Sequence, residues 1–92
     1  MWHAVAPVAA DYDPILYESP VASNALVLNA GPGSIVVRAW VEIDSYGREP
    51  QIAVELRPGD QRTLGGRLIR ARLLDGKYAA IAWHLLSAEV RQ

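Results

Sequence analysis

The stretch GSIVVRAWVEIDSYGREPQIAVELRPG, from Gly33 to Gly59, predicts the fold class of the chain. Every second residue from Ile35 to Ile43 is apolar, and the same alternation returns from Ile52 to Leu56. A period of two is the pattern of a half-buried strand. Between the two runs, Asp44-Ser45-Tyr46-Gly47 supplies residues that cap the backbone and accept a positive φ angle. We therefore predict a β-hairpin with one face in a core.

Turn signals divide most of the remaining chain into short segments. Asn24 to Ala30 is expected to be a strand that turns at Gly31-Pro32-Gly33, and Gln61 to Leu64 a short edge strand broken by Gly65-Gly66. Arg67 to Leu74 alternates, with Ile69, Ala71 and Leu73 toward the core. Turns about ten residues apart, with no long helix between them, predict an all-β domain over residues 24–92. Its expected form is a small antiparallel β-sandwich, immunoglobulin-like or jelly-roll-like, of about six or seven strands.

The run from Tyr78 to Leu86 has two interpretations. The Asp75-Gly76 hairpin signal stands directly before it, which favours a strand. The inward residues of that strand would be Ala79, Ile81, Trp83 and Leu85. The alternative is a helix, because YAAIAWHLLSAEVRQ is rich in good helix formers. Ser87 to Gln92 is expected to fray or to form one helical turn.

Residues 1–23 differ from the rest. Pro7, Pro14 and Pro20 each remove a backbone donor, so a long central strand is not expected here. The segment nevertheless carries apolar side chains that need a surface to cover. We predict an extended N-terminal arm that lies on its own domain or on a neighbouring copy, and an edge strand of its own domain is the alternative. The arm residues expected at an interface are Trp2, Val5, Val8, Ile15, Leu16 and Tyr17.

Length and composition limit the function classes. A chain of 92 residues forms one domain with a modest core, and without Cys it has neither disulfides nor thiolate metal sites. Self-association or docking onto a larger assembly would supply the missing stability. No signal-like or membrane-spanning run is evident, so the expected location is a cytoplasm or a particle assembled in one.

The charges are unevenly spread along the chain. Up to Gly47 there are five acidic residues against one basic residue, and from Arg48 onward there are five acidic against eight basic. Such asymmetry favours contacts between the acidic part of one copy and the basic part of another. The basic excess is too small for a nucleic-acid-binding domain, so no nucleic acid partner and no membrane partner are expected.

No motif predicts catalysis or a cofactor. The chain has no Gly-x-Ser-x-Gly sequence, and His3 and His84 come from opposite ends. Asp11 and Asp13 have a spacing found in calcium loops, but the further oxygen ligands of such a loop do not follow. We predict a protein that is not an enzyme and that has no catalytic, cofactor or metal residues.

Trp40 is the most informative single residue. It alternates with the inward residues and shares the outer face with Arg38 and Glu42, and an outward Trp is typical of a contact surface. Three interpretations remain open: the N-terminal arm covers it, another copy covers it, or it binds carbohydrate with Tyr46, Tyr78 or Trp83. Arg70 and Arg72 belong to the same outer face and are interface candidates that would form weak ion pairs with Glu42 and Glu55.

Three segments carry a resemblance to a known family. They are Leu26-Val27-Leu28-Asn29-Ala30-Gly31, Leu56-Arg57-Pro58-Gly59-Asp60 and Tyr78-Ala79-Ala80-Ile81. In this order they resemble small β-sandwich accessory proteins of tailed bacteriophage virions, over roughly residues 24 to 86. The resemblance implies a non-enzymatic protein, often oligomeric, that decorates or cements a capsid or forms part of a tail or spike. A carbohydrate-binding β-sandwich is the alternative function.

Overall fold

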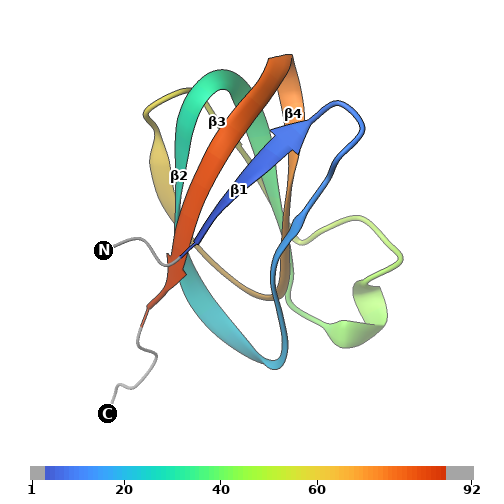
Figure 1. Cartoon of the computed structure of the whole chain (residues 1–92). Helices are drawn as coiled ribbons and strands as arrows, with labels where there is room; N and C mark the ends of the chain where they lie inside the picture. The colour runs from blue at the N-terminus through green and yellow to red at the C-terminus, as the bar shows by residue number, and fades with distance from the viewer. Residues whose placement is uncertain (1–3, 87–92) are drawn as a thin grey trace.

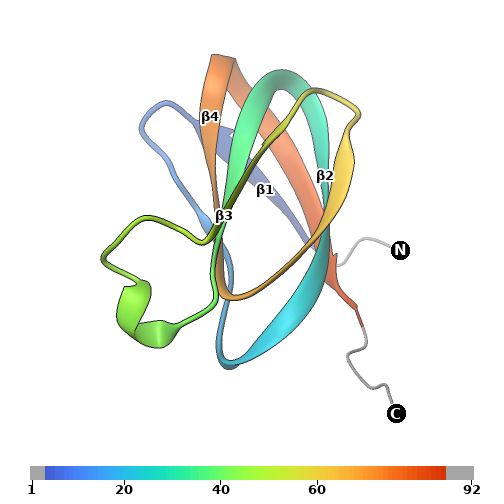
Figure 2. The same ribbon diagram turned by 180° about the vertical axis from the view of Figure 1, so that it is seen from behind.

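The computed structural model describes residues 4–86, which form an all-β fold. One antiparallel sheet holds four strands in the order β1-β4-β2-β3. The end strands β1 (Ala4–Ala9) and β3 (Ile52–Leu56) are short, whereas β2 (Ile15–Trp40) and β4 (Gln61–Leu85) have 26 and 25 residues. A single turn of 3-10 helix, η1 (Ile43–Ser45), follows β2. Figures 1 and 2 show that the long strands bend, so the sheet curls around its core.

The strand number differs from the expected six or seven because three expected breaks, at Gly31-Pro32, Gly65-Gly66 and Asp75-Gly76, are continuous. The two parts of β4 on either side of Asp75-Gly76 both pair with β2, so no hairpin forms there. At Gly31-Pro32, β2 changes direction but keeps its pairing with β4. Gly65 and Gly66 likewise stay in the ladder, paired with Asn24 and Ser23. A residue without a side chain lets a strand bend sharply without leaving its partner. The sequence therefore located the bends correctly, but the prediction that they separate strands is wrong.

The middle of β2 is paired on both sides. Ala25 lies opposite Leu64 in the first part of β4 and opposite Leu85 in its last part. The next three residues of β2 have two partners in the same way. Ile69 of β4 also has two partners in β2, Tyr17 and Ala39. Each long strand thus folds back on the other, which gives the sheet its curl.

The central hairpin is confirmed, but its connection is wider than predicted. β2 and β3 pair from Ile35 opposite Leu56 to Ala39 opposite Ile52. The inward residues Ile35, Val37 and Ala39 are fully buried. β2 ends at Trp40, and Ile43 lies in η1 with half of its surface exposed, so it is not an inward strand residue.

The last run is a strand as far as Leu85, and the helical alternative is wrong. Its inward residues Ala79 and Ile81 are fully buried, as are Ile69 and Ala71 before Asp75-Gly76. Leu85 is partly exposed at the strand end. The expectation for Ser87 to Gln92 lies outside the described residues.

The N-terminal segment belongs to the sheet of its own chain from Ala4 onward. β1 pairs with the last part of β4, and Val8 is fully buried there. Leu16, at the start of β2, is also in the core. The edge-strand alternative is therefore observed for Ala4–Ala9. Residues 15–23 belong to the inner strand β2, so the expectation of no long central strand in this segment is wrong, and the predicted boundary after residue 23 falls within β2.

A buried asparagine holds two turns together. The side-chain nitrogen of Asn29 donates to the carbonyl oxygens of Gly33, at 2.8 Å, and Leu56, at 2.9 Å. Its side-chain oxygen accepts from the backbone N–H of Gly31 at 2.7 Å. The main chain of Asn29 makes two further hydrogen bonds to the turn at residues 57–60. Asn29 therefore occupies a core-facing position because backbone groups there need partners.

Candidate functional site

The outer face of the sheet is rich in arginine where β3, β2 and β4 lie side by side. Arg38 of β2 stands between Ala53 of β3 and Arg70 of β4. One row along, Val36 stands between Glu55 of β3 and Arg72 of β4. Two guanidinium groups directly opposite each other repel, so this arrangement requires a neutralising partner.

Asp13 is that partner. Its Oδ1 atom accepts from the Nη2 atom of Arg38, and its Oδ2 atom lies 3.5 Å from the Nη2 atom of Arg70. Arg70 also donates to the backbone oxygen of Asp13 at 2.9 Å. The Arg38 side chain is only 14% exposed, whereas that of Asp13 is 36% exposed. Asp13 thus fixes the start of β2 to the arginine pair of its own chain.

We expect Asp13→Ala to lower the free energy of unfolding by about 1 to 2 kcal/mol, because two facing arginines lose their shared carboxylate. The value is below that of a fully buried pair because Asp13 and Arg70 are partly exposed. Urea unfolding measures the loss. Asp11→Ala is the matched control, since Asp11 is exposed and makes no ion pair with the described residues. Equal losses in the two variants would contradict the role of Asp13.

Trp40 is buried, with only 5% of its surface exposed, so the prediction of an outward contact residue is wrong. It is on the expected face, but loop 41–51 of its own chain returns over it. The indole Nε1–H donates to the backbone oxygen of Arg48 at 3.0 Å, and the guanidinium carbon of Arg38 lies 5.6 Å from the ring centroid. None of the three sequence interpretations included this loop.

Side-chain hydrogen bonds give loop 41–51 a defined shape. The hydroxyl of Ser45 is buried and donates to the backbone oxygen of Glu42 at 2.7 Å. The side-chain oxygen of Gln51 accepts from the backbone N–H of Val41 at 2.7 Å, which closes the loop at its base. The loop therefore presents Arg48 and its neighbours in a fixed position beside the sheet.

A cleft of about 270 Å³ lies between this loop and the outer face of the sheet. The strands contribute Val36, Arg38, Trp40, Ala53 and Arg72. The loop contributes Arg48, Glu49 and Pro50. Three guanidinium groups and one carboxylate thus line a cleft whose remaining surface is largely apolar. Arg48 and Arg72 form no ion pair within residues 4–86, so both are available to an acidic group from outside.

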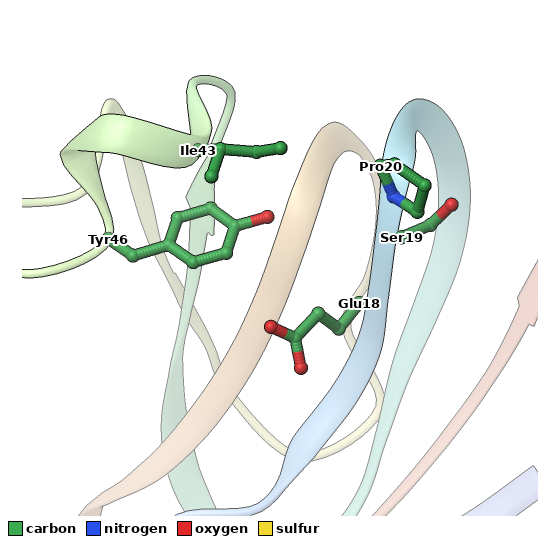
Figure 3. A pocket seen from close by; sticks show the side chains of 5 residues that line it. All are labelled: Glu18, Ser19, Pro20, Ile43 and Tyr46. Atoms are coloured by element: carbon green, nitrogen blue, oxygen red, sulfur yellow. The ribbon is translucent and has the colours of Figure 1, made fainter.

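A second hollow, of about 410 Å³, lies on the other side of the loop. Figure 3 shows the Tyr46 ring and Ile43 facing the bend of β2 at Ser19-Pro20, with the carboxylate of Glu18 nearby. Its walls are mostly apolar, and these five residues contain no paired nucleophile and base. The hollow can accommodate an apolar group, with the carboxylate of Glu18 beside it.

The structure separates the sequence-predicted interface residues into three groups. Val8, Leu16 and Trp40 are buried in their own chain, which corrects the expectation that they contact a neighbour. Arg70 is engaged by Asp13 and Tyr17 donates to the Val21 backbone oxygen at 3.1 Å, whereas Ile15 and Arg72 are exposed.

Trp2 lies outside the described residues, and Val5 pairs with Ala82 through β1. The sequence reasoning missed Arg48. Its position just after the turn residue Gly47 was the available signal, since a hairpin loop returns toward its own strands.

Among residues 4–86 there is no group of three or more His, Asp or Glu side chains arranged to hold a metal ion. His3 lies outside this range. The same part of the chain has no helix long and apolar enough to span a membrane.

Comparison of the chain with protein-family models, with curated proteins and with solved structures gave no match.

Proposed function

We propose that the chain is a non-enzymatic structural or interaction protein that self-associates and docks onto a larger protein assembly. The observation that carries the proposal is the free edge of β3. Within the described part of the chain, β3 is the last strand of the sheet and pairs only with β2. A free strand edge is a template for pairing with another chain.

The sequence of β3 lacks the strongest features that block such pairing, although the strand is short and carries Glu55. Its five residues, Ile52-Ala53-Val54-Glu55-Leu56, include no Pro or Lys, and their ladder to β2 has no bulge. The opposite end strand, β1, differs because Pro7 lacks a backbone donor. The contrast favours β3 as the edge that binds a partner.

The larger assembly that we propose is a virion, where the chain would act as a decoration or cement protein or as part of a tail or spike. The resemblance of residues 24–86 to accessory proteins of tailed bacteriophages supports this choice. Two of the segments that carry it, Asn29-Ala30-Gly31 and Leu56 to Asp60, are in direct contact through the hydrogen bonds of Asn29. They form one structural unit at the end of the sheet where β3 ends.

The alternative function, carbohydrate binding, has lost the residue on which it depended. A sugar platform requires an exposed aromatic ring, and Trp40 is covered by loop 41–51. Tyr78 of β4 is exposed, but the ring around which the predicted platform was centred is not.

We also propose that the curled sheet acts as a small β-sandwich. Val8, Val27 and Ile81 belong to the part of the sheet nearest β1, and Ile35, Val37 and Ile69 to the part nearest β3. All six side chains belong to one core cluster. Two faces that share a single core correspond to the two layers of a sandwich.

The native mass of the purified chain tests self-association. We expect light scattering at rising protein concentration to show a discrete oligomer, because free edge strands and segregated charges both favour contact between copies. A monomer at every concentration would contradict the proposal. Deleting residues 1–20 is not a suitable variant, since it removes Val8 and Leu16 from the core.

A further inference from the structure

We infer that two copies of the chain join antiparallel through their β3 strands, and that Glu55 of each copy enters the arginine-lined cleft of the other. This inference rests on the proposed self-association and names its surface and register. It uses the free edge of β3 together with the cleft beside it, which Ala53 of the same strand helps to line.

The register follows from the five residues of β3. When two such strands pair about Val54, Ile52 lies opposite Leu56 of the second copy and Val54 lies opposite Val54. All inward apolar residues then stay on one face, as the period of two requires. A shift by one residue would place apolar side chains opposite exposed ones. A register centred on Glu55 would set two carboxylates against each other.

The register about Val54 places Glu55 of the second copy opposite Ala53. Ala53 is small and stands beside Arg38 in the ladder, so the next row of the joined sheet would read Glu55, Ala53, Arg38. Directly opposed residues have Cβ atoms about 5 Å apart, which brings the incoming carboxylate to the mouth of the cleft.

The cleft offers this carboxylate Arg48 as its partner. Arg38 is already bound to Asp13, and Arg72 belongs to β4, three strands away from the incoming β3, whereas Arg48 forms no ion pair among residues 4–86. Glu49 also lines the cleft, but with three arginines the lining keeps an excess of positive charge. Glu55 itself is exposed in the single chain. The contact is reciprocal: with a two-fold axis between the copies, each cleft receives Glu55 of the other copy.

Charge reversal at Glu55 tests the contact. We expect Glu55→Arg to weaken self-association at least about tenfold, because it sets a cation against the arginines of the partner. Asp11→Arg is the control: Asp11 is an exposed acid outside the strands that forms no ion pair among residues 4–86. The variant Glu55→Arg with Arg48→Glu restores opposite charges across the axis and should recover association. Unchanged circular dichroism and a cooperative urea transition verify that each variant is folded.

An engineered cysteine tests the register. The natural sequence has no Cys, so a single substitution gives one thiol per chain. In the register about Val54, the two Val54→Cys residues lie opposite each other within reach of a disulfide. We expect oxidation to give a covalent dimer with Val54→Cys and none with Ala22→Cys, which is exposed on β2.

The outcomes separate the two proposals. A wild-type chain that is monomeric at all concentrations overturns both. A wild-type oligomer that Glu55→Arg leaves intact overturns the β3 contact and leaves the proposed self-association standing. An oligomer that Glu55→Arg dissociates, but that the charge-swapped double variant does not recover, overturns the pairing of Glu55 with Arg48. Recovery together with the Val54→Cys dimer establishes surface and register.

Discussion

Replacing Asn29 with Ala should lower the free energy of unfolding by about 3 to 5 kcal/mol, because three hydrogen bonds disappear at once from a fully buried site. The substitution leaves the N–H of Gly31 and the carbonyl groups of Gly33 and Leu56 without their partner. Urea unfolding at constant temperature measures the effect. A loss of this size is a large part of the stability of a small domain.

Asn24→Ala is the control, because Asn24 is the other asparagine of the chain and lies exposed on the same strand. We expect its change to stay within about 0.5 kcal/mol. Asn29→Asp adds a second comparison. It keeps the shape of the side chain but replaces the two donated hydrogen bonds by a charge that faces carbonyl oxygens, so it should be at least as harmful. A loss below about 1 kcal/mol for Asn29→Ala would contradict the role assigned to Asn29.

Gly33→Ala should lower the free energy of unfolding by about 2 to 3 kcal/mol, since a methyl group does not fit where two stretches of backbone meet. A Cβ atom on Gly33 would lie 2.6 Å from the backbone oxygen of Asp75 and 2.8 Å from that of Tyr78. Backbone cannot rotate away as a flexible side chain does, so the bend at Asp75-Gly76 would have to move. Thermal or urea unfolding checks the prediction.

Gly47→Ala is the matched substitution in loop 41–51. Gly47 has no positive φ angle, and an added Cβ atom would meet nothing within 4 Å. The variant should be neutral or more stable by up to about 1 kcal/mol, because alanine restricts the unfolded chain. Similar losses for both variants would show that the close approach at Gly33 is not the cause.

Alternation of apolar residues predicted most of the strands and their faces. Val37 and Ile69 are buried where the period of two places them. The hairpin expected at Asp75-Gly76 is wrong, because β4 continues through these residues and both of its parts pair with β2. The pattern did not predict that β2 and β4 continue through their glycines, because the same residues permit a turn or a bend. The pairing of β2 with β4 decides between a turn and a bend, and the paired residues lie far apart in the sequence.

The candidate site was less predictable for the same reason. Period two assigned Trp40 to the outer face but carried no information about which loop would cover it. Asp13 meets Arg70 across 57 positions of sequence, and no spacing rule connects two such residues. The position of Asn29 did carry a signal. It follows Ala25 and Val27 at the same spacing and is therefore a polar residue in a core-facing row.

The double pairing of Ala25 to Leu28 has a consequence for how the domain loses its structure. Opening the last part of β4 leaves this segment attached to the first part, and the reverse is also true. If either part of β4 separates from β2, core residues that pack against the other part become exposed. We therefore expect the sheet to open in one cooperative step, with Ala25 to Leu28 as its slowest-exchanging amides and β3 as its fastest-exchanging strand in the isolated chain.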